Sequence, residues 1–201
     1  MTVMVKDPTK EARVPFISAC LLAILGLALT AVSLATPEWT VARGVRIGLW
    51  SLTDENGKTY EWTGPRDYED FFYSSWFLAV RGMMMASIII GSLGIFFNLF
   101  LIVKRKHSPT EANALMGYYL LAFALVVVSV SVYSCLIPQG LDIDGKITTI
   151  KASIVEYIYV GGYGYSLWIG WIASGFFLLA CGLAFEGSNQ VIRAKKMLGI
   201  E

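Results

Sequence analysis

Few side chains in this sequence have the type and spacing that catalysis or metal binding requires. The one histidine, His107, lies in a basic stretch, and the three cysteines, Cys20, Cys135 and Cys181, lie inside or at the edges of apolar runs. Zinc sites need such ligands at short, regular spacings, which are not found here. The sequence also contains no phosphate-binding glycine loop, no G-x-S-x-G motif and no N-x-S/T acceptor. It therefore predicts no catalytic residue, no cofactor-binding site and no metal site, and hence no enzyme.

Two polar residues inside apolar runs remain to be explained. Arg81 lies a few residues into the second run, so its side chain is expected to extend outward or to pair with an acidic loop residue at the membrane surface. The functional alternative is an arginine that conducts ions or binds a ligand. Asn98 is expected to hydrogen-bond a neighbouring helix. We favour the structural role for both residues.

The elements that position these residues follow from composition. The chain is 56% hydrophobic and 15% charged, with a mean hydropathy of +0.60, which indicates a membrane protein. A net charge of +1 gives no overall basic field, so we expect no nucleic-acid partner. Runs long enough to span the bilayer cover residues 14–35, 76–103, 112–137 and 165–185. The first run is too long for a cleaved signal peptide and is expected to remain as a helix.

The distribution of lysine and arginine predicts the orientation. Nine lie in the N-terminal segment, the short middle loop and the tail, and six lie in the long loops, residues 36–75 and 138–164. Because basic residues are retained in the cytoplasm, both termini are expected there and both long loops outside. The sequence thus predicts a multi-pass plasma-membrane protein, a single domain over residues 1–201, built as an up-down bundle of four helices.

The first long loop has the pattern of a small sheet. Its apolar residues alternate with polar or small ones, which predicts a strand with one buried face through Val41, Val45, Ile47 and Leu49. Asn56-Gly57 predicts a hairpin turn, followed by a returning strand over residues 59–62. Trp39 is expected at headgroup depth with one edge in water. In the second loop, residues 147–160 are consistent with either a helix extension or a strand.

An acidic and aromatic stretch closes the first loop. It is a candidate extracellular interaction surface, or the lining of a path that favours cations. The alternative is that its phenylalanines only anchor the loop at the membrane interface. The stretch consists of Asp67, Tyr68, Glu69, Asp70, Phe71 and Phe72.

Several motifs together resemble the claudin superfamily, which includes claudins, peripheral myelin and epithelial membrane proteins, and the gamma-type auxiliary subunits of channels and receptors. Trp39, Gly48, Leu49 and Trp50 fall on the W-GLW signature of that group, and Arg81 on the arginine that follows its first loop. The resemblance covers nearly the whole chain. It implies a membrane all-α four-helix transmembrane bundle topped by a small extracellular antiparallel β-sheet, with a strand or helix extension from the second loop.

Two departures from the family pattern bear on function. The family signature continues into two cysteines that bond across strands, yet residues 52–72 contain no cysteine. Claudins commonly end in a PDZ-binding hydrophobic residue, whereas this sequence ends in Ile200-Glu201. The outer sheet must therefore be held by strand pairing and aromatic packing, or by a partner.

The resemblance implies a non-enzymatic role in cell–cell junctions, adhesion or paracellular barrier organisation. The expected partners are the lipid bilayer and either other copies of the chain or another membrane protein, such as a junctional protein, a channel or a receptor. The alternative role is an auxiliary subunit that modulates an ion channel or receptor. A lipid-handling membrane enzyme would need a buried acid, base or nucleophile in the spans, and the sequence offers none.

Overall fold

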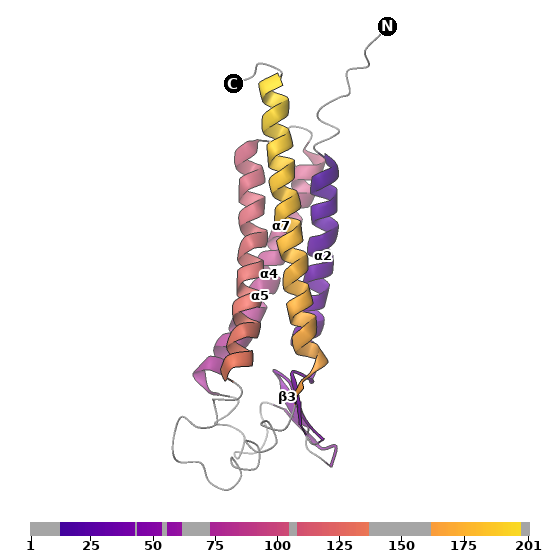
Figure 1. Ribbon diagram of the computed structural model, residues 1–201, viewed down its shortest axis with the longest axis vertical. Coiled ribbons are helices and arrows are strands. Elements are labelled where there is room, and N and C mark those ends of the chain that lie inside the picture. Colours follow the sequence, from indigo (N-terminus) through magenta and orange to yellow (C-terminus); the bar gives the residue numbers. More distant parts are fainter. Residues whose placement is uncertain are drawn as a thin grey trace.

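The protein is a bundle of four long helices with a small sheet at one end (Figure 1). The computed structural model describes residues 13–42, 44–53, 56–61, 73–104, 108–136 and 162–197. All four helices are long and apolar enough to cross a membrane. They are α2 (Arg13–Ala35), α4 (Ser75–Val103), α5 (Pro109–Leu136) and α7 (Tyr165–Met197). The fold class predicted from the sequence is confirmed.

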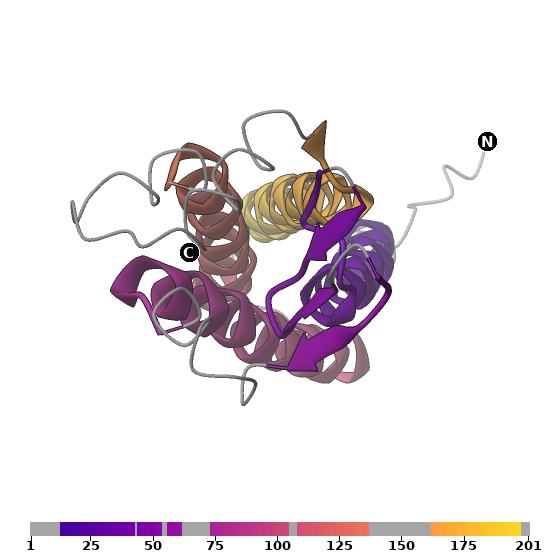
Figure 2. The same ribbon diagram turned by 90° about the horizontal axis from the view of Figure 1, so that it is seen from below.

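The helices form a ring in which each contacts two neighbours. Helix α2 packs on α4 and α7, and α5 packs on the same two helices from the other side (Figure 2). Small residues allow close approach where the helices cross. A Cβ atom on Gly91 would lie 3.0 Å from the ring of Phe177, and one on Gly94 would lie 3.0 Å from the ring of Tyr119. These glycines therefore serve helix packing.

Several polar side chains buried inside the bundle form hydrogen bonds between helices. The Asn98 amide nitrogen, on α4, donates to the carbonyl oxygen of Phe16 on α2 at 3.1 Å and to the hydroxyl of Tyr119 on α5 at 2.9 Å. Ser129 on α5 donates to the carbonyl oxygen of Val80 on α4 at 2.9 Å. One amide thus joins three helices, as expected for a polar residue in hydrocarbon.

A capping box sets the start of α5, three residues before the start expected for the third span. The backbone N–H of Ser108 donates to the Glu111 carboxylate at 3.1 Å, which is the reciprocal contact of an S-x-x-E helix start. The other oxygen of Glu111 pairs with Lys104 at the end of α4. Pro109 is well placed as the first helical residue because it lacks an N–H to satisfy.

The sheet joins the two long loops. Its strands are β1 (Thr40–Ala42), β2 (Val45–Ile47), β3 (Ser51–Thr53), β4 (Thr59–Glu61) and β5 (Gly162–Tyr163). They lie in the order β4-β3-β2-β1-β5, and every pair is antiparallel. The central row of facing residues runs through Thr40, Ile47 and Leu52, all of which are buried. Because β5 comes from the end of the second loop, that loop contributes a strand, while residues 147–160, expected to be a helix extension or a strand, lie outside the described residues.

The prediction of one strand from Val41 to Leu49 is wrong in one respect. The segment is a hairpin of β1 and β2, because the chain reverses at Gly44, which has a φ of +90°. Glycine adopts this conformation without the strain that a Cβ would cause. The turn predicted at Asn56-Gly57 is present, with a φ of +77° at Gly57, and the returning strand β4 follows it.

Replacing Gly164 tests how tightly the second loop is locked to the first. A Cβ on Gly164 would overlap the carbonyl oxygen of Glu38, whereas one on Gly162 would meet nothing within 4 Å. We expect G164A to destabilise the protein by about 1–3 kcal/mol, or several degrees in Tm, and G162A to leave Tm unchanged. Thermal unfolding in detergent, followed by tryptophan fluorescence, measures both. Equal Tm values for the two variants would contradict this packing.

Candidate functional site at the junction of sheet and bundle

The signature tryptophan lies inside the protein at the point where the sheet meets the helices. Trp39 is 0% exposed, and its indole N–H donates to the carbonyl oxygen of Ser33, at the end of α2, at 2.7 Å. Its ring meets that of Tyr133, on α5, edge to face with a centroid distance of 4.8 Å. The expectation of a ring with one wet edge is therefore wrong for Trp39, because the protein itself supplies the acceptor for its N–H.

Gly48 allows the chain to cross over itself at the same place. A Cβ on this residue would lie 2.6 Å from the Cα of Pro37, so any other residue would collide with backbone. The Gly48 N–H donates to the carbonyl oxygen of Ser51 at 2.8 Å and closes a tight turn between β2 and β3. The glycine of the signature is thus required by close packing of the backbone.

Arg81 contacts the next two residues of the signature, Leu49 and Trp50. It is 3% exposed, and its Nε donates to the carbonyl oxygen of the buried Leu49 at 2.6 Å. Its guanidinium carbon lies 5.1 Å from the ring centroid of Trp50 and 4.6 Å from that of Phe77, distances at which a cation is attracted to a ring face. Arg81 thus contacts a backbone carbonyl and two aromatic rings, which are the contacts that a structural role would use.

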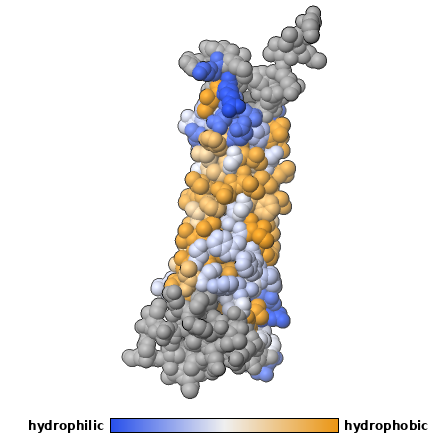
Figure 3. All heavy atoms as spheres, viewed as in Figure 1, coloured by the Kyte–Doolittle hydropathy of each residue, from blue (hydrophilic) through white to orange (hydrophobic). Residues whose placement is uncertain are grey.

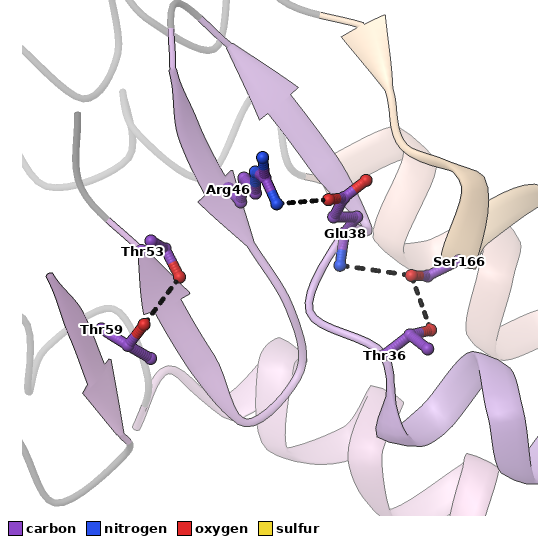
Figure 4. Close-up of polar contacts among 6 residues, drawn as sticks. All are labelled: Thr36, Glu38, Arg46, Thr53, Thr59 and Ser166. Atoms are coloured by element: carbon purple, nitrogen blue, oxygen red, sulfur yellow. Dashed lines mark hydrogen bonds and ion pairs between the residues drawn. The ribbon is translucent and has the colours of Figure 1, made fainter. Parts of the chain in front are cut away.

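A second set of contacts ties the sheet to α7 and α5. The hydroxyl of Ser166, in the first turn of α7, accepts from the hydroxyl of Thr36 at 2.7 Å and from the N–H of Glu38 at 3.2 Å (Figure 4). The N–H of Ser166 donates back to the carbonyl oxygen of Glu38 at 3.1 Å. Thr40 and Tyr133 share a hydrogen bond of 3.0 Å between their hydroxyls. Sequence reasoning missed Ser166 and Tyr133, because serine and tyrosine near a helix end carry no distinctive signal.

Two threonines pair on the outer face of the sheet, where the chain has no disulfide. Thr53 on β3 faces Thr59 on β4, and their hydroxyl oxygens lie 3.1 Å apart (Figure 4). On the same face, Arg46 pairs with Glu38 at 2.9 Å. Both contacts are largely exposed, and such contacts contribute less than about 1 kcal/mol each. Each of these two contacts is therefore expected to stabilise the sheet less than a buried hydrogen bond of the junction does.

The structure brings the five signature residues into one cluster. The other candidates are the acidic stretch and the cysteines. The acidic stretch, residues 67–72, lies outside the described residues. Cys20 and Cys181 are buried in the bundle, Cys135 is exposed at the outer end of α5, and all three thiols are free. Among the described residues, no group of three histidine, cysteine, aspartate or glutamate side chains is placed to hold a metal ion.

Comparison with known families fits this architecture. The family model described as "Tight junction protein, Claudin-like" matches residues 7–193. The chain belongs to this claudin-like family. No curated protein matches it. As a claudin-like protein it is a tetraspan membrane protein, and its signature residues lie at the junction of sheet and bundle.

Substitution of Arg81 tests the role of the buried arginine in this claudin-like protein. We expect R81A to destabilise the protein by about 1–3 kcal/mol, because the buried carbonyl of Leu49 would lose its donor. R46A is the matched control, because it removes an arginine whose side chain is 56% exposed in its ion pair. It should lower the free energy of unfolding by only about 0–1 kcal/mol. Unfolding in detergent compares the two, and an R81A protein as stable as R46A would show that the contact is dispensable.

Proposed function

We propose that this protein acts at contacts between cells, with its sheet outside the membrane, in junction organisation, adhesion or a paracellular barrier. The observation that carries the proposal is the way in which the sheet is mounted. Its strands come from both long loops, and it is fixed to the helix ends through Arg81, Trp39 and Ser166. A surface held on rigid elements is suited to repeated contact with identical surfaces. Family membership supports the same role.

The proposed orientation puts both termini in the cytoplasm. It is supported by the excess of lysine and arginine in the N-terminal segment, the loop between α4 and α5, and the tail. The sheet would then face an oxidising compartment, and the acidic stretch at residues 67–72 would be available to partners. These partners are proposed to be other copies of the chain or junctional proteins in the same or the facing membrane.

A second candidate is an auxiliary subunit of a channel or receptor. The first loop lacks the cysteine pair of the family, and a loop covered by a partner needs less stabilisation of its own. Both candidates are non-enzymatic, and both use the outer sheet. They differ in whether the protein gathers where two expressing cells meet.

A disulfide engineered across the outer strands tests the orientation. We expect the two cysteines introduced by T53C/T59C to oxidise in cells, because the threonine hydroxyls that they replace lie 3.1 Å apart and disulfides persist outside the cytoplasm. The diagonal pair S51C/T59C is the control, since Ser51 faces Glu61 rather than Thr59. Thiol alkylation before and after reduction, followed by peptide mapping, detects the bond. A fully reduced T53C/T59C pair would place the sheet in the cytoplasm.

Mixed cell culture tests the role. We expect the tagged protein to concentrate at borders between two expressing cells and not at borders with cells that lack it. Neutralising the acidic stretch with D67N/E69Q/D70N should reduce this enrichment severalfold, whereas E61Q on the exposed edge of β4 should not. Even distribution over the surface, together with stoichiometric purification of a channel or receptor, would overturn the junction role and support the auxiliary subunit.

A further inference from the structure

The end of the bundle away from the sheet carries exposed cations on several helices. Figure 3 shows hydrophilic residues gathered where α7 ends, beyond a hydrophobic band. Arg193 and Lys196, near the end of α7, are exposed, and Arg13, at the start of α2, is half-buried. Lys104, at the end of α4, is also exposed. Four cations at this level come from helices that are far apart in the sequence.

Helix α7 is longer than the hydrocarbon core of the membrane is thick, so the cations near its end lie outside the core. It contains 33 residues, which corresponds to about 50 Å at 1.5 Å per residue, whereas the hydrocarbon core is about 30 Å thick. Its first turn packs against the sheet through Ser166, so the excess length lies at the opposite end. At this rise Arg193 and Lys196 lie about 42 and 46 Å along α7 from Tyr165, which is past the hydrocarbon core and close to the thickness of about 40–45 Å that the bilayer has with its headgroups.

Among the described residues, the acidic groups at this end form no ion pair with these two cations. The carboxylate of Glu111 is paired with Lys104, and the carboxylate of Glu186 accepts from the side-chain nitrogen of Gln190 at 3.3 Å. Arg193 and Lys196 form no ion pair with any residue that the structure describes. They are thus available to an anion.

Exposed apolar side chains lie beside the same cations. Phe185 is 53% exposed and Ile192 is 46% exposed. Positions 185, 192 and 196 are seven and four residues apart, so they share one face of the helix. This face offers an apolar surface for an acyl chain below and a cation for a headgroup above, which is the arrangement that suits a phospholipid.

We propose that the inner end of the bundle binds anionic phospholipids through the last turns of α7, with Arg193 and Lys196 contacting the headgroup phosphates and Phe185 and Ile192 the acyl chains. A basic residue near an anionic membrane surface contributes about 1 kcal/mol, which is about fivefold in affinity. Two such residues together favour an anionic over a zwitterionic lipid at this site by about twenty-five-fold. The protein would then concentrate acidic lipid around itself in the cytoplasmic leaflet.

Reconstitution into lipid nanodiscs tests the proposal independently of the junction role. The full chain is placed in nanodiscs of phosphatidylcholine with one fifth phosphatidylserine, and the lipids retained after detergent extraction are counted by native mass spectrometry. Both leaflets have the same composition, so the result does not depend on the orientation. We expect phosphatidylserine to be enriched severalfold over its bulk share, and less so at high salt, because the attraction is screened.

Charge variants locate the site. R193Q/K196Q should abolish most of the enrichment, whereas the swap R193K/K196R should retain it and shows that the positions tolerate change. K58Q, which removes a cation from the exposed β3–β4 turn at the other end, should have no effect. Bulk-like lipid around the wild-type protein would overturn the proposal. So would an enrichment that R193Q/K196Q leaves intact.

Discussion

The hydrogen bond from Arg81 to the carbonyl oxygen of Leu49 joins the sheet to the helix bundle. A buried arginine in a membrane helix is costly unless its donors are satisfied, and here the chain places a backbone carbonyl and two aromatic rings around it. The neighbouring carbonyl of Val80 accepts from Ser129 on α5. Two adjacent residues of α4, Val80 and Arg81, thereby join this helix to α5 and to the sheet.

The same constraint explains the other end of the sheet. The chain leaves α2 and enters β1 through a half-buried segment, in which Thr36 and Glu38 find hydrogen-bond partners within the protein. Ser166 serves as donor and acceptor to this segment, and Trp39 caps the last turn of α2. Thr36 and Glu38, at the start of the first loop, are thus paired with the first turn of a helix that follows the second loop.

This arrangement accounts for a claudin-like sheet without its disulfide. A disulfide stabilises by about 2–4 kcal/mol, and a pair of cross-strand threonines by less than about 1 kcal/mol. The buried contacts of the junction are of the size needed to offset the difference, because a buried hydrogen bond that is broken costs about 1–3 kcal/mol. The sheet depends on the bundle more than on its own cross-link, which ties the shape of the outer surface to the packing of the helices.

The sequence by itself determined the four spans, their order and the turn at Gly57, because long apolar runs and Asn-Gly turns are local features. It also identified the signature residues, although only as a pattern. The tertiary structure decided what that pattern does. The bond from Ser33 to Ser166 joins residues 133 positions apart, and the bond between Thr40 and Tyr133 spans 93 positions, so no local period reports them. Likewise, the alternation of apolar and polar residues continues through Gly44, and only the pairing of β1 with β2 shows that the chain reverses there. The period of the apolar residues records which face of a strand is buried and not which strand lies beside it.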